Sequence, residues 1–593
     1  MRNKAVLDIE CYVNYFLIAI KSVANGKIAT FERSDWTDFD PEPLKSLLSK
    51  YTIITFNGNR YDLLLLKGSI AGFDSQKLKA LSDDIIVKDL RAWDAESKYN
   101  LPKCMYIDHI DLIEVAPGKA SLKIYGGRLH SKRMQDLPIE PNATIKQNER
   151  DLLSSYCIND LDTTVDLYGR LSEQIELREQ MSKEYLLELR SKSDAQIAES
   201  VIKKQIEAIR GEKVYRPSLP KDFSFNYVPP LFVAFKHPEL DRALDIFKTK
   251  PFTLDEKGDV AEPLEVGKLK IKVGSSTYQL GIGGIHSCEK KVHYIADANH
   301  VIVDRDVTSY YPSVILNQKL YPDHIGPDFL TVYRSLVEKR IKAKREGNKV
   351  INEALKVTIN GSFGKFGSRW SALYGPNLLI QTTVTGQLSL LMLIEALEEQ
   401  SISVVSANTD GIIIYCQKRN QAAMETIVAR WERTTGFSTE ETDYTALYSR
   451  DINNYIALKR NGGYKVKGVY ADENLSKTPT TQICTQAVVD YLQLDIPIET
   501  TINECTEIRK FISVRAVTGG AVKNNEYLGK AVRWYYAKDE QGAIHYKKNG
   551  NKVPITDGAK PLMILPDFLP NDIDHDWYIK KAHTMLNDLG VTK

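Results

Sequence analysis

Short apolar runs that end in acidic residues recur in this chain, and they predict buried strands that carry carboxylates. Residues 301–306 pass from β-branched side chains to a final aspartate, and Tyr311-Pro312 then turns the backbone out of the strand. Residues 5–10 repeat the pattern with two acidic positions. Acidic residues at a strand end are also common turn formers, so the pattern alone leaves both interpretations open.

The N-terminal run places Asp8 and Glu10 two residues apart, so in a strand both side chains project from one face. Neighbouring carboxylates repel each other unless a cation lies between them, which points to a metal site. A second strand over residues 53–56 leads into Asn57 and, at Asp62, into a leucine-rich helix.

A predicted helix then carries Tyr156 and Asp160 one turn apart on one face. Each of these features is common singly in ordinary structure. Their occurrence together, in this order within the first third of the chain, is far less common.

The centre of the chain predicts two helices joined by a tight turn at residues 347–348, an antiparallel hairpin. The first helix has Arg340 and Lys344 on one face, and the second has Lys356 and Asn360 one turn apart. A charged face is usually a solvated surface, and that interpretation stays open. A β-hairpin is predicted over residues 402–415, which could be no more than a good turn.

The remaining segments are less informative. Residues 176–210 are charged and helix-like, which predicts a connecting helix before a proline-broken stretch. Alternation in residues 268–274 predicts a hairpin, and the glycine-rich residues 281–284 either form a turn or cradle a phosphate. Beyond residue 470, helical and strand fragments rich in Lys, Tyr and Trp are predicted.

Length and composition restrict the class of protein. A chain of 593 residues is too long for one core, so we expect three or more units. With 43% hydrophobic residues and no apolar run approaching the ~18 residues of a membrane span, we expect a soluble protein with no membrane partner. Acidic residues interrupt the first apolar run, and a signal peptide would not tolerate them there. We therefore expect a cytoplasmic protein.

Charge and cysteine content add little. A formal net charge of +2 neither favours nor excludes nucleic acid, because local patches set phosphate affinity. The seven cysteines form no CxxC pair, so we expect buried thiols instead of a zinc site or a disulfide framework.

Six segments, in order, resemble the motifs of family B DNA polymerases. The polymerase motifs DxxSLYP, KxxxNSxYG and DTDS are matched by residues 306–312, 356–364 and 408–411. The motifs DxE, Nx3(F/Y)D and Yx3D of the family's ribonuclease H-like proofreading domain are matched by residues 8–10, 57–62 and 156–160.

The resemblance implies an α/β multidomain fold, with a ribonuclease H-like exonuclease domain followed by a right-hand polymerase. The implied boundaries are exonuclease 1–175, connecting segment 176–290, palm 291–325, fingers hairpin 326–370, palm 371–468 and thumb 469–593. It further implies template-directed DNA synthesis from dNTPs with 3′–5′ proofreading, by a monomer acting on primer-template DNA. Single-stranded DNA would enter the exonuclease site. Each site would use two Mg²⁺ or Mn²⁺ ions, and the compact chain resembles viral members that act in the host cytoplasm.

The matching positions imply roles for individual residues. Metal ligands would be Asp8, Glu10, Asp62 and Asp160 in the exonuclease, with Tyr156 in support, and Asp306, Val307 and Asp410 in the polymerase. The incoming nucleotide would contact Ser309, Tyr310, Tyr311, Arg340, Lys344, Lys356 and Asn360, and Tyr311 would exclude a 2′-hydroxyl. DNA would contact Asn57, Ser121, Leu122, Lys465, Lys467 and Gly468.

Three departures from the family bear on whether the chain synthesises DNA. Asn408 and Gly411 replace the first Asp and the Ser of DTDS, and Asn453 stands where the lysine of KxY is common. Alternatives are therefore an exonuclease with a degenerate polymerase domain, or a protein-primed polymerase, for whose insertions the motif spacing leaves little room. A non-enzymatic DNA-binding protein would need both metal sites lost, which the retained carboxylates argue against. The sequence indicates no particular processivity factor.

Overall fold

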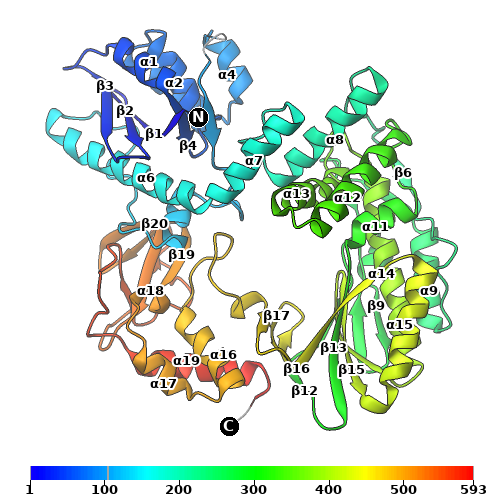
Figure 1. The fold of residues 1–593 in the computed structure, drawn as a ribbon. Coiled ribbons are helices and arrows are strands. Elements are labelled where there is room, and N and C mark those ends of the chain that lie inside the picture. The colour runs from blue at the N-terminus through cyan, green and yellow to red at the C-terminus, as the bar shows by residue number, and fades with distance from the viewer. Residues whose placement is uncertain (1, 103–105, 592–593) are drawn as a thin grey trace.

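The computed structural model describes residues 2–102 and 106–591, which form a mixed α/β, multidomain protein. Its parts follow one another around a ring in Figure 1. We call them the N-terminal unit (residues 2–171), the helical unit (172–210 and 328–366), the central unit (211–317 and 376–466) and the C-terminal unit (468–591).

The N-terminal unit is built on a sheet with strand order β3-β2-β1-β4-β5. Strand β1 pairs antiparallel with β2 and parallel with β4, so it lies inside the sheet with apolar side chains buried on both faces. The strands are β1 (Asn3–Cys11), β2 (Tyr15–Ser22), β3 (Ile28–Ser34), β4 (Tyr51–Thr55) and β5 (His109–Asp111). The helices are α1 (Pro41–Lys50), α2 (Asp62–Ile70), α3 (Ser75–Ile86), α4 (Ala92–Lys98), α5 (Leu122–Arg128) and α6 (Arg150–Arg170).

The helical unit contains the predicted hairpin, α12 (Asp328–Arg345) and α13 (Lys349–Phe366), with Gly347 in the left-handed region at the turn (φ 70°). The prediction of one connecting helix over residues 176–210 is wrong. Helices α7 (Ser172–Tyr185) and α8 (Asp194–Arg210) are separate, because Leu186 turns left-handed and Ser193 caps the second helix. Helix α8 packs against α12 and α13, so it is part of this bundle.

The central unit is a large sheet with the order β18-β17-β16-β13-β15-β14-β11-β10-β9, and β12 pairs with β16. Residues 270–287, predicted as part of a connecting segment, thus belong to this sheet. Its strands are β9 (Lys270–Val273), β10 (Ser276–Gln279), β11 (His286–Ser287), β12 (Val292–Ile295), β13 (His300–Val307), β14 (Ser403–Asn408), β15 (Gly411–Gln417), β16 (Thr439–Asp451), β17 (Asn454–Lys459) and β18 (Tyr464–Val466). Its helices are α9 (Pro238–Thr249), α10 (Leu264–Gly267), α11 (Tyr310–Asn317), α14 (Pro376–Glu398) and α15 (Gln421–Thr435), beside a small sheet of β6 (Ser224–Phe225), β7 (Phe252–Leu254) and β8 (Val260–Ala261).

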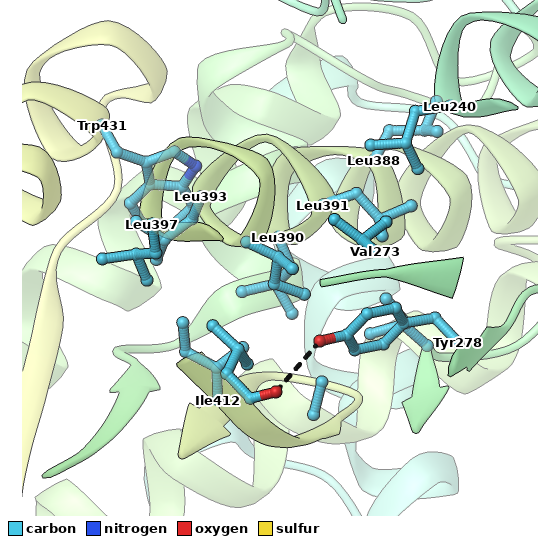
Figure 2. Packing of buried hydrophobic residues seen from close by; sticks show 14 of the residues in the cluster. Leu240, Val273, Tyr278, Leu388, Leu390, Leu391, Leu393, Leu397, Ile412 and Trp431 are labelled. Atoms are coloured by element: carbon cyan, nitrogen blue, oxygen red, sulfur yellow. Dashed lines mark hydrogen bonds between the residues drawn. The ribbon is translucent and has the colours of Figure 1, made fainter. Parts of the chain in front are cut away.

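Helix α14 forms the core of the central unit. Figure 2 shows its leucines between the sheet residues Val273, Tyr278 and Ile412 on one side and Trp431 of α15 on another. The Trp431 indole N–H donates to the carbonyl of Ser389 in α14 at 2.7 Å. This packing fixes the back of the sheet whose other face carries the candidate site.

Helix α14 contains no uninterrupted apolar run of ~18 residues, but its mean hydropathy is high over that length. By length and composition this helix could cross a bilayer, but 78% of its most apolar stretch is buried inside the protein. The expectation of buried thiols holds for Cys11, Cys157, Cys416 and Cys484, whereas Cys288 is exposed and Cys505 is half-buried. Cys104 lies outside the described residues.

The C-terminal unit packs against the N-terminal unit. Arg533 is fully buried and donates to the carbonyl of Ser131 at 2.8 Å, and the Tyr527 hydroxyl donates to Asp136 at 2.7 Å. The strands are β19 (Ser513–Lys523), β20 (Glu526–Tyr536), β21 (His545–Tyr546) and β22 (Ala559–Pro561), and the helices are α16 (Gln482–Leu494), α17 (Ile498–Glu504), α18 (Ile508–Phe511) and α19 (His575–Asp588).

Candidate active sites

Two paired strands bring Asp306 and Asp410 to neighbouring positions in the central unit. Strand β13 pairs antiparallel with β15, so that Asp306 lies opposite Gly411, the residue after Asp410. The Val307 N–H donates to the Asp410 carbonyl oxygen at 2.7 Å. Both carboxylates line one cavity of about 390 Å³, which we call the central cavity.

Two residues beside these carboxylates lie in the left-handed region of backbone space. Ser309 (φ 48°) precedes α11, and Thr409 (φ 59°) forms the β14–β15 turn. For a β-branched residue such as Thr409 this conformation costs ~1–3 kcal/mol, so the surroundings must hold it. Its N–H donates to the Ile285 carbonyl at 2.9 Å, and Gly284 approaches so closely that a Cβ there would lie 2.9 Å from the Thr409 Cα. The glycine-rich segment therefore supports this turn, which favours its structural interpretation.

Three more charged residues line the central cavity, Asp304, Lys465 and Lys467. Asp304 is two residues before Asp306, so both side chains project from the same face of β13. The Lys465 ammonium, expected to contact DNA, lies 3.1 Å from Asp304 Oδ2 and 3.4 Å from Asp306 Oδ2. Sequence analysis assigned no role to Asp304. The two-residue alternation of the strand was the signal that could have found it.

Electrostatics within the central cavity favour a bound cation. Burial, and then the Asp306 carboxylate, raise the pKa of both Asp304 and Asp410 above the ordinary range. Burial by itself lowers the pKa of Lys465. Asp304 and the other groups around the ammonium outweigh this effect and raise the pKa overall, so the ammonium stays charged. Burial, with Lys465 nearby, lowers the pKa of Lys467, which lines the same cavity.

The candidate phosphate contacts on α12 lie beside the β13–α11 connection. Arg340 Nη1 donates to the Ser309 hydroxyl at 3.3 Å. The Lys344 ammonium lies 3.7 Å from a carboxylate oxygen of Glu440, the residue that β16 pairs with Asp306. These contacts connect α12 to the β13–α11 connection and to β16, the strand paired with β13.

On α13, Lys356 and Asn360 are both exposed one turn apart, as predicted. The Tyr311 ring packs against Phe363 of the same helix, with ring centroids 4.4 Å apart. The Tyr310 side chain is only 4% exposed and its hydroxyl donates to a backbone carbonyl of α14 at 2.6 Å. Tyr310 therefore packs in the core, and Tyr311 is the motif tyrosine with a partly exposed ring.

Four predicted carboxylates of the N-terminal unit come from three elements. Asp8 and Glu10 lie on β1, Asp62 is the first residue of α2, and Asp160 lies on α6. Oxygen atoms of Asp8 and Glu10 lie within 4.8 Å of each other and of the Cys157 sulfur.

Burial and mutual repulsion act on this cluster. Burial, and then Asp160, raise the pKa of Asp8 to about 7. Burial and the neighbouring Asp8 carboxylate also raise the pKa values of Glu10 and Asp62 well above the ordinary range. Burial raises the pKa of the Cys157 thiol, so it stays protonated at neutral pH. The donor set is therefore carboxylate oxygen, which suits Mg²⁺ or Mn²⁺.

Lys123 is a residue of this site that sequence analysis missed. Its ammonium pairs with Asp160 and lies 4.3 Å from the ring centroid of Tyr156. It follows Ser121 and Leu122, two candidate DNA contacts, and that position was the available signal. Ser121 itself caps α5 by accepting the Ile124 N–H at 3.4 Å.

The Asn57 turn is held by Asp111, another missed residue. Asn57 lies in the left-handed region (φ 69°), and its N–H donates to Asp111 Oδ1 at 2.8 Å. The Asn59 N–H donates to the other carboxylate oxygen at 2.9 Å. Gly468 has a comparable structural role, because a Cβ there would overlap the Asn453 carbonyl oxygen.

Comparison with known proteins gives local similarity to DNA polymerases. No family model matches the chain. Over 182 residues, 30% of this chain, it is 26% identical to DNA polymerase 1 of Saccharolobus solfataricus, 20% of which is covered. Over 132 residues, 22% of this chain, it is 30% identical to DNA polymerase 1 of Aeropyrum pernix, 13% of which is covered. Over 120 residues, 19% of this chain, it is 25% identical to DNA polymerase II of Escherichia coli, 15% of which is covered.

These stretches are similar to DNA polymerases. The matched stretches span 20% or less of these relatives' own lengths. Among solved structures, the family B DNA polymerase of Pyrobaculum calidifontis aligns with 100% of this chain and 79% of its own, at a TM-score of 0.41 and 13% identity. No viral protein is among these four, so viral origin stays a prediction.

Proposed function

We propose that this chain is a DNA-directed DNA polymerase with a separate 3′–5′ proofreading exonuclease site. The observation that carries the proposal is the pairing of β13 with β15, which places Asp306 and Asp410 together in the central cavity. A second carboxylate cluster lies in the N-terminal unit, and the local similarity to DNA polymerases supports the assignment.

In this proposal Asp306, Asp410 and the Val307 backbone hold two Mg²⁺ ions. When bound, one ion would lower the pKa of the primer 3′-hydroxyl, and the other would neutralise negative charge on the leaving pyrophosphate. Arg340, Lys344, Lys356 and Asn360 bind the triphosphate of the incoming dNTP. Tyr311 lies beneath its sugar and excludes a 2′-hydroxyl.

For proofreading, Asp8, Glu10, Asp62 and Asp160 hold the metal ions. Asn57, Ser121 and Leu122 contact the single-stranded 3′ end, and Tyr156 and Lys123 orient Asp160. The N-terminal unit is then the exonuclease domain, the central unit the palm, the helical unit the fingers and the C-terminal unit the thumb. Sequence-independent phosphate contacts would come from the thumb.

Separation-of-function variants test this proposal on one labelled primer, with Mg²⁺ and at low and high dNTP. Asp410→Asn keeps the side-chain volume but removes a charge, so extension should fall by orders of magnitude while a mismatched 3′ end is still degraded. The double variant Asp8→Ala, Glu10→Ala should extend primers without trimming them.

The alternatives predict different outcomes in the same assay. Degradation without extension by the unmodified protein identifies an exonuclease with a degenerate polymerase domain. Extension that needs a protein hydroxyl in place of a DNA primer identifies a protein-primed enzyme. Loss of both activities in a folded Asp410→Asn protein contradicts two independent sites.

A further inference from the structure

The central cavity contains a buried ion pair that the proposed metal ligands do not require. Asp304 is 4% exposed, and its Oδ2 atom accepts hydrogen bonds from the Tyr444 hydroxyl and the Lys465 ammonium. A buried carboxylate is costly unless it is paired and hydrogen-bonded, and these two donors meet that need.

Lys465 reaches this position from the edge of the sheet. Strand β18 pairs with β17, and the ammonium extends over β16 towards β13. It is closer to Asp304 (3.1 Å) than to Asp306 (3.4 Å), and Asp304 is the more buried partner, with a side-chain exposure of 4% against 50%. Coulombic attraction is stronger where water is excluded, so Asp304 holds the ammonium more firmly.

A single ammonium therefore contacts one carboxylate that the proposed reaction needs and one that it does not. We propose that Asp304 is a positioning residue: it anchors the Lys465 ammonium beside Asp306, so that Asp306 stays free to bind a divalent cation. Without Asp304, the remaining carboxylate in the ion pair with Lys465 is Asp306 itself. The ammonium would then compete with the divalent cation for the same oxygen atoms.

The proposal rests on the proposed function only in treating Asp306 and Asp410 as cation ligands. The test measures Mn²⁺ binding by electron paramagnetic resonance in the full chain, with Asp8→Ala and Glu10→Ala present so that the N-terminal cluster does not contribute. Asp304→Asn keeps the side-chain volume and should weaken Mn²⁺ binding about tenfold or more, the usual range of linked binding equilibria. Adding Lys465→Met to Asp304→Asn should restore most of the lost affinity.

The control is Lys467→Met, which removes a lysine of the same cavity that no ion pair connects to Asp304 or Asp306 in the described structure. Added to Asp304→Asn, it should restore much less affinity than Lys465→Met. If circular dichroism shows that Asp304→Asn is not folded, Tyr444→Phe serves instead. It removes one hydrogen-bond donor to Asp304 and should give a smaller loss of Mn²⁺ affinity, which Lys465→Met again reverses.

Two results overturn the proposal. Equal Mn²⁺ affinity in Asp304→Asn and the parent protein shows that the anchor has no effect. An affinity loss that persists in the Asp304→Asn, Lys465→Met protein identifies Asp304 as a ligand in its own right. A parent protein that binds Mn²⁺ but extends no primer would contradict the polymerase proposal. The effect of Asp304 and Lys465 on Mn²⁺ affinity could still be measured in that protein.

Discussion

The Asp306 carboxylate occupies the space that a side chain at Gly411 would need. A Cβ built on Gly411 would overlap Asp306 Oδ1 and lie 3.2 Å from the Arg305 carbonyl oxygen. A serine at this position, as in the DTDS motif, would require the Asp306 carboxylate to shift. The glycine and the present orientation of Asp306 therefore belong together.

Gly411→Ala should accordingly impair synthesis. A displacement of about 1 Å in a catalytic group can cost roughly 100-fold in rate, so we expect primer extension to slow by ~10–100-fold while degradation of a mismatched 3′ end is kept. Gly169→Ala is the matched control, because no atom beyond the backbone of its own helix lies within 4 Å of a Cβ there. Single-turnover extension rates decide the matter, and an unchanged rate in Gly411→Ala would show that the Asp306 orientation is not required.

Tyr311 should control sugar selection. Its ring packs on Phe363 of α13 and is partly exposed, whereas the neighbouring Tyr310 ring is buried. Tyr311→Val should raise ribonucleotide incorporation and leave primer binding unchanged. Tyr310→Phe removes only a buried hydroxyl and should cost about 1 kcal/mol of stability without changing selection. The ratio of rNTP to dNTP incorporation in single-turnover kinetics is the readout, and equal ratios in all three proteins contradict the assignment.

Lys356 should act on the nucleotide and not on the DNA. It is exposed on α13, and its ion pair with Glu353 at 3.5 Å is of the surface type that contributes little. A charge-assisted phosphate contact is worth about 1.5–3 kcal/mol, so Lys356→Ala should weaken dNTP use ~10–100-fold.

Lys365 provides the control on the same helix. Its ammonium pairs with Glu199 of α8 at 3.1 Å, and both side chains are largely buried. Lys365→Ala should therefore lower stability and leave the apparent dNTP affinity unchanged. Equal losses of dNTP and DNA affinity in Lys356→Ala would identify Lys356 as a backbone-contact lysine.

The elements that carry the motifs were predictable because their signals are local. The two-residue spacing of Asp8 and Glu10 and the one-turn spacing of Tyr156 and Asp160 are set by strand and helix geometry alone. The ion pairs of Lys465 with Asp304 and of Lys123 with Asp160 were not predictable. They join residues far apart in the chain, and only the assembled sheet and helices bring them together.

The same limit applies to the unit boundaries. Leu186 interrupts the helical stretch by adopting the left-handed conformation, although leucine is a good helix former. Strands β9 to β11 are short, and nothing in their own sequence indicates that they extend the sheet containing β13. The apolar run of α14 is broken by Thr, Gln and Ser residues, which hid its length from a search for uninterrupted hydrophobic segments.

The raised pKa of Asp8 predicts a pH-dependent stability of the metal-free protein. In the folded chain burial, and then Asp160, raise this pKa from 3.8 to about 7, and the opposing charge of Lys123 does not cancel the shift. The folded state therefore binds this proton more tightly than the unfolded state, so the free energy of unfolding falls as pH rises between about 4 and 7. In EDTA we expect a lower Tm at pH 7.5 than at pH 5.5.

Mg²⁺ replaces the proton as the partner of the carboxylates, so the gain in Tm on adding Mg²⁺ should be larger at pH 7.5 than at pH 5.5. Asp8→Asn should reduce both the pH dependence in EDTA and the Mg²⁺ gain. The contrasting control is Asp84, whose pKa is lowered by hydrogen bonds from Lys88 and Lys98. Its contribution is complete above the unfolded pKa, so Asp84→Asn should lower Tm equally at both pH values. A Tm difference between the two pH values that is the same in Asp8→Asn and the parent protein would show that the proton is held elsewhere.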